Sequence, residues 1–77
     1  MIKEVLQEIV KAIVDNPEQV KVSEIDGDQT VILEVSVADG DLGKVIGRNG
    51  RTITAIRSIL ASVGGKNGRR YVLELVE

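Results

Sequence analysis

A chain of 77 residues has room for one hydrophobic core, because a domain of this size buries only about 60% of the surface that its unfolded chain exposes. Its apolar side chains are almost all aliphatic, with one Tyr and no Phe or Trp, and the absence of Cys excludes disulfides and thiolate metal sites. The net charge of −2 does not by itself favour a polyanionic partner, and no apolar run approaches the roughly 20 residues of a membrane-spanning helix. We therefore expect residues 1–77 to form a single soluble domain in the cytoplasm, without a membrane segment or a secretory signal.

The first half of the chain predicts a helix followed by a hairpin. Apolar residues recur with the 3.6-residue period of an amphipathic helix over residues 2–14, and the Asn-Pro pair at 16–17 ends this pattern. Valine then alternates with polar residues at 20–22, and aliphatic residues alternate with other side chains over 31–37. The Asp-Gly-Asp sequence at 26–28 supplies the turn, so these two strands form a hairpin with one side facing the core.

Two helices are predicted next. A short helix covers residues 42–46, with Asp41 as its N-cap and Gly47 at its end. A longer helix restarts near Gly50 or Arg51. Its broad apolar stripe consists of Ile53, Ile56, Ile59, Leu60 and Val63.

The C-terminal part predicts a loop and a last strand. Gly64 and Gly65 are expected to end the long helix through a left-handed cap, and residues 66–68 to continue the loop. Aliphatic and aromatic side chains alternate again over residues 71–75, which predicts a strand. The expected fold is a two-layer α+β sandwich of order α-β-β-α-α-β, in which three helices cover a three-stranded sheet.

The segment between the two later helices contains a GxxG loop with aliphatic residues on both sides. Glycine at 47 and 50 permits a tight turn and leaves the backbone open to a phosphate. The helix that begins after Gly50 is expected to offer unpaired N–H groups and its positive dipole end to an anion, and the neighbouring aliphatic residues to form a groove wall for unstacked bases. The candidate binding residues are Lys44, Val45, Ile46, Gly47, Arg48, Asn49, Gly50, Arg51 and Ile53.

Charge is distributed unevenly along the chain. Residues 1–43 carry three basic and ten acidic side chains, a net charge of −7, whereas residues 44–77 carry seven basic and two acidic side chains, a net charge of +5. This asymmetry indicates an anionic partner for the second part, where Arg69 and Arg70 are expected to extend the phosphate track. The alternative is that these charges only solvate exposed loops and helix faces.

The pattern V-I-G-x-x-G-x-x-I over residues 45–53 resembles the KH domain, whose loop clamps about four nucleotides. The predicted element order resembles the type II arrangement of bacterial KH domains, and a freestanding domain of this length is similar to the KhpA family of small RNA-binding proteins. The resemblance covers essentially the whole chain. It implies single-stranded RNA as the ligand, no cofactor, and a role as an RNA chaperone or post-transcriptional regulator.

The same resemblance implies protein partners. Members of the KhpA family form homodimers, and many pair with a larger protein, KhpB or Jag, in a complex linked to cell-wall synthesis and cell length. The residues themselves leave the dimer surface unassigned.

Other functions fit these residues less well. A nucleotide-binding enzyme needs GxxxxGK[ST] or GxGxxG, and neither spacing occurs. Without Cys or His, a general base has to be a carboxylate, and the carboxylates concentrate away from the loop, so we predict no enzyme activity. A protein-interaction or dimerisation module with weak or no nucleic-acid binding stays an alternative, as does single-stranded DNA binding. The lack of exposed aromatic platforms predicts modest discrimination between bases.

Overall fold

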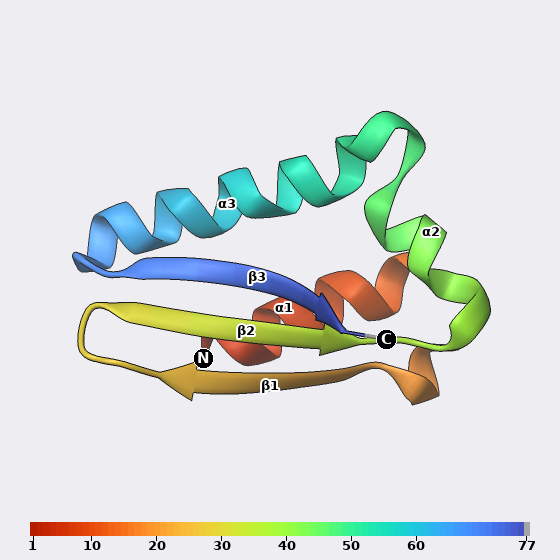
Figure 1. Ribbon diagram of the computed structural model, residues 1–77, viewed down its shortest axis with the longest axis horizontal. Helices are drawn as coiled ribbons and strands as arrows, with labels where there is room; N and C mark the ends of the chain where they lie inside the picture. The colour runs from red at the N-terminus through yellow and green to blue at the C-terminus, as the bar shows by residue number, and fades with distance from the viewer. Residues whose placement is uncertain (77) are drawn as a thin grey trace.

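The computed structural model describes residues 1–76, whose elements follow one another in the order α-β-β-α-α-β (Figure 1). The helices and strands are α1 (Ile2–Ile13), β1 (Lys21–Asp26), β2 (Thr30–Ser36), α2 (Leu42–Ile46), α3 (Arg51–Asn67) and β3 (Arg70–Val76). Short 3₁₀ helices at Pro17–Gln19, Asp39–Asp41 and Arg48–Gly50 lie in the connections. The predicted element order and the α+β class are confirmed. None of the helices described here combines the length and the apolar character that crossing a bilayer requires.

The three strands form one mixed sheet in the order β1-β2-β3. β1 and β2 are antiparallel, and the N–H of Gly27 donates to the carbonyl of Thr30 at 2.9 Å to close the predicted hairpin. β3 runs parallel to β2, with Leu33 beside Leu73. A parallel neighbour needs a long crossover, which α2 and α3 provide.

The helices cover one face of the sheet and enclose an aliphatic core. α1 packs against β1 and α3 against β3; in Figure 1, α1 passes behind the sheet and α3 follows the edge beside β3. Ile59 differs from its prediction, because its side chain is 49% exposed and lies outside the buried stripe of α3. The buried core consists of Leu6, Val10, Val20, Val22, Val31, Leu33, Val35, Val45, Ile53, Ile56, Leu60 and Leu73.

α3 is longer at its C-terminal end than predicted. The Gly64–Gly65 pair does not end the helix, which continues to Asn67 and is capped by Gly68 in the left-handed conformation, with φ 70° and ψ 25°. Gly64 is buried instead. No side chain fits at this position, because a Cβ there would lie 2.3 Å from the carbonyl oxygen of Arg69. The close approach of α3 to the start of β3 therefore explains why position 64 is a glycine. The local sequence does not reveal this contact.

These two neighbouring glycines should respond in opposite directions to alanine. Gly64→Ala is expected to lower the free energy of unfolding by about 1–3 kcal/mol, because the added methyl group meets a backbone carbonyl that has little freedom to move. Gly65→Ala meets no atom within 4 Å and should raise the same quantity by up to about 1 kcal/mol through helix propensity. Urea unfolding measures both changes, and equal effects at the two positions would contradict the packing described.

Candidate nucleic-acid interface

A tight turn with left-handed backbone joins α2 to α3, at the end of the molecule opposite the β1–β2 hairpin (Figure 1). Gly47 ends α2 as predicted, with φ 78°, and its N–H donates to the carbonyl of Gly43 at 2.8 Å. Asn49 and Gly50 follow with φ of 56° and 74°. The N–H of Gly50 donates to the carbonyl of Gly47 at 3.1 Å and closes the turn. We call residues 47–50 the GxxG turn.

The two glycines are needed for different reasons. A Cβ at Gly47 would lie 2.2 Å from Oγ1 and 2.8 Å from the backbone nitrogen of Thr52, so no side chain fits there. A Cβ at Gly50 would meet no atom within 4 Å, so only the positive φ favours glycine. Asn49 is one of the few residue types that adopt this conformation at low cost. The backbone at Gly50 is therefore open to the approach of a phosphate.

Cationic side chains surround the GxxG turn. Arg48, Asn49 and Arg51 are all exposed. The Nζ of Lys44, on α2, lies 3.5 Å from the carboxylate of Asp15, and the two side chains are 45% and 74% exposed. Ion pairs exposed to this extent contribute at most about 1 kcal/mol, so Lys44 can exchange Asp15 for a phosphate at little cost.

The start of α3 differs in one respect from the predicted anion site. The N–H of Arg51 donates to the carbonyl of Arg48, so the turn itself uses this group. The positive end of the helix dipole still lies here, because the 17-residue α3 begins at Arg51. We therefore expect the arginine side chains to contribute more to the attraction of an anion, and the backbone N–H groups to contribute less, than the sequence predicts.

Burial separates the predicted binding residues into two groups. Val45 and Ile53 are 1% and 7% exposed and belong to the core. They hold α2 and α3 in place beneath the GxxG turn, and neither offers the predicted groove wall to a base. Ile46 is 36% exposed and supplies apolar surface next to Gly47.

Asp41 lies at the predicted cap position of α2, but its side chain does not cap that helix. It is 1% exposed and turns towards the end of α1. There its carboxylate accepts hydrogen bonds from the N–H and Nδ2 of Asn16, at 2.9 and 3.2 Å, and from the N–H of Asp15 at 3.3 Å. Burial raises the pKa of Asp41, but these hydrogen bonds and the charge of Lys44 outweigh it and bring the pKa below its ordinary value of 3.8. Asp41 is therefore an anionic link between α1 and α2.

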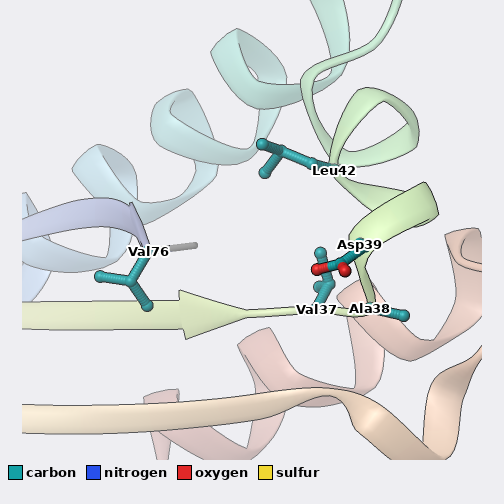
Figure 2. Close-up of a pocket in the computed structure, with 5 residues that line it drawn as sticks. All are labelled: Val37, Ala38, Asp39, Leu42 and Val76. Atoms are coloured by element: carbon teal, nitrogen blue, oxygen red, sulfur yellow. The ribbon is translucent and has the colours of Figure 1, made fainter.

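A hollow of about 280 Å³ lies beside α2 (Figure 2). The segment after β2, the first residue of α2 and the end of β3 contribute its lining: Val37, Ala38, Asp39, Leu42 and Val76. We call it the α2 hollow. Leu42 and Ile46 are the two ends of α2, about 6 Å apart along its axis, so this helix connects the hollow to the GxxG turn. The sequence predicts none of the lining residues as a binding residue. Val76 is distant from α2 along the chain, and only the fold places the two side by side.

Residues 3–75 match the family described as "KhpA/KhpB, KH domain". The chain belongs to this family. It is 51% identical over 75 residues to a protein named RNA-binding protein KhpA from Chlamydia pneumoniae, covering 97% of this chain and 96% of that one. Proteins of the same name from Aquifex aeolicus and Clostridium acetobutylicum are each 45% identical, over 99% and 96% of this chain and over 96% and 99% of their own lengths. No solved structure gives a significant match.

Membership of the KhpA/KhpB family confirms two predictions. The resemblance drawn from residues 45–53 identifies the right family. The family is one of non-enzymatic KH domains, so the chain is not an enzyme.

In this KhpA/KhpB domain, Arg69 and Arg70 lie far from the GxxG turn. They follow α3, whose 17 residues span about 25 Å. The guanidinium of Arg69 donates to the carboxylate of Asp26 and, at 2.8 Å, to the carbonyl of Gly27. Arg69 therefore fastens the β1–β2 turn to the start of β3 and does not extend a phosphate track from the GxxG turn.

Proposed function

We propose that this KH domain, formed by residues 1–77, binds single-stranded RNA through the GxxG turn. The observation that carries the proposal is the open backbone at Gly50, which lies between the exposed cations Arg48 and Arg51. The names of the relatives, RNA-binding protein KhpA, support it.

Phosphates and bases have separate places in this proposal. A phosphate rests on the bare backbone at Gly50 and receives charge-assisted hydrogen bonds from Arg48 and Arg51, whose planar guanidinium groups match its oxygens. Lys44 leaves Asp15 to pair with a neighbouring phosphate. Bases that are free of stacking lie against Ile46 and in the α2 hollow, so a single strand is favoured over a duplex, which hides the base faces. RNA is favoured over single-stranded DNA by the names of the relatives.

We also propose that the protein acts as a homodimer. One GxxG turn neutralises few phosphates, so a single domain binds weakly, and two linked domains gain affinity by holding the same strand. The joint description of the family as KhpA/KhpB supports a KhpB-type partner in addition. Such an assembly fits a cytoplasmic RNA chaperone or post-transcriptional regulator that affects cell-wall synthesis and cell shape.

The salt dependence of RNA binding tests the site. If Lys44, Arg48 and Arg51 each neutralise one phosphate, the logarithm of the association constant should fall against the logarithm of salt with a slope of about −2. Fluorescence anisotropy with a short labelled U-rich RNA, between about 50 and 300 mM KCl, measures this slope. A DNA strand of the same sequence and a duplex RNA are the comparison ligands. A slope near zero, or equal affinity for the duplex, would contradict the proposal.

A further inference from the structure

Among the described residues that line the α2 hollow, Asp39 is the charged one, and its carboxylate lies among aliphatic side chains (Figure 2). Three other aspartates have side-chain partners: Asp15 pairs with a lysine, Asp26 with an arginine, and Asp41 accepts hydrogen bonds. Within residues 1–76, the side chain of Asp39 takes part in no such hydrogen bond or ion pair. Its two oxygens are therefore available to accept hydrogen bonds from a ligand.

An acidic group close to a phosphate-binding turn is unfavourable unless the ligand brings donors to it. The RNA backbone is anionic and repels Asp39, whereas the edges of the bases carry N–H groups. The α2 hollow has the volume of roughly nine water molecules, enough for one planar base. Val37, Leu42 and Val76 supply apolar contacts for the faces of that base. The carboxylate among these side chains therefore fits a base edge better than the backbone.

We propose that the α2 hollow is a guanine-selecting subsite in which Asp39 reads the base, an inference that rests on the proposed RNA binding. The Watson–Crick edge of guanine presents two adjacent donors, N1–H and the N2 amino group, and a carboxylate accepts both at once. Adenine and cytosine present one amino group beside a ring nitrogen whose lone pair repels the carboxylate. Uracil presents one N–H between two carbonyl oxygens. Only guanine makes two charge-assisted hydrogen bonds with Asp39.

Selection of this kind adds to the modest base discrimination that the sequence predicts. That prediction follows from the lack of aromatic stacking platforms. Two hydrogen bonds to one carboxylate discriminate by the pattern of donors and not by stacking, so they need no aromatic side chain.

The test compares short U-rich RNAs that differ only in one central base. Single guanosines avoid the self-association of G-rich strands. Guanine is expected to bind about tenfold more tightly than uracil at this position, the order of one good bidentate contact to a base. Inosine, which lacks the N2 amino group, should lose most of this advantage. Asp39→Asn should reduce the preference for guanine over uracil to less than about threefold, because the amide presents one acceptor and one donor.

Asp28→Asn is the matched control. Asp28 is an exposed aspartate of the β1–β2 turn, so the substitution makes the same change in charge at the other end of the molecule. It should leave the preference for guanine unchanged. If Asp39→Asn tightens binding of every RNA by the same factor, Asp39 only repels the backbone, and the guanine subsite is refuted while RNA binding stands. If no RNA binds the unmodified protein in a salt-dependent way, the proposed function fails together with this subsite.

Discussion

Replacing Arg48 and Asn49 together by aspartate is expected to weaken the binding of single-stranded RNA by at least about 100-fold. The two changes shift the charge of the GxxG turn by three units and place carboxylates where phosphates should lie, and like charges a few ångströms apart near a protein surface repel by several kcal/mol. Both glycines remain, and aspartate tolerates the left-handed backbone of position 49 as asparagine does. Gel shift and fluorescence anisotropy at about 0.1 M salt measure the loss, and the thermal unfolding midpoint checks that the fold persists.

The same pair of replacements at the other end of α3 is the control. Asn67→Asp with Arg70→Asp changes the net charge by the same amount at two exposed positions. These positions lie about 25 Å from the GxxG turn, more than two Debye lengths at 0.1 M salt. The affinity should therefore fall by less than about fivefold. Equal losses in the two variants would show that net charge governs binding, and undiminished affinity of the turn variant would refute the proposed site.

Local periodicity predicts most of the fold, because every helix and strand buries one face against the same core. The 3.6-residue period of α1 and the alternation in β2 and β3 are visible in the chain for that reason. The end of α3 is different. Gly64 and Gly65 have the composition of a cap, but Gly64 is a contact point with the carbonyl of Arg69, five residues further on. A glycine selected by packing and a glycine selected by φ look alike in a sequence.

The candidate site is predictable where backbone conformation dictates residue type. Gly47 and Gly50 have positive φ, so glycine at these positions indicates the turn directly. The α2 hollow and the partners of Asp41 depend on contacts between distant segments, such as the hydrogen bond to Asn16, 25 residues away. The sequence alone therefore predicts the GxxG turn. The α2 hollow and the partners of Asp41 can be identified only in the folded structure.

Substitution of Asp41 should strongly lower the stability of the domain. Asp41→Asn replaces one acceptor oxygen by an NH₂ group, which faces the donors of Asn16 or Asp15 in a site where the side chain is only 1% exposed. The expected result at pH 7 is a fall in the thermal unfolding midpoint on the order of 10 °C. Circular dichroism measures it. The control is Asp39→Asn, two residues earlier, where the side chain is exposed and the midpoint should shift by less than about 2 °C.

The same substitution should flatten the response of stability to acid. Because the pKa of Asp41 in the folded protein lies below its ordinary value of 3.8, its stabilising effect is present above that value and is lost as the pH falls through the folded-state pKa. The difference in midpoint between the unmodified protein and Asp41→Asn should therefore be largest near neutral pH and shrink below about pH 4. The pKa of Glu4 is also lowered, by its hydrogen bond with the N-terminal ammonium, but this group is present in both proteins and cancels in the comparison. A difference that stays constant down to about pH 2 would mean that the charge of Asp41 does not stabilise the link between α1 and α2.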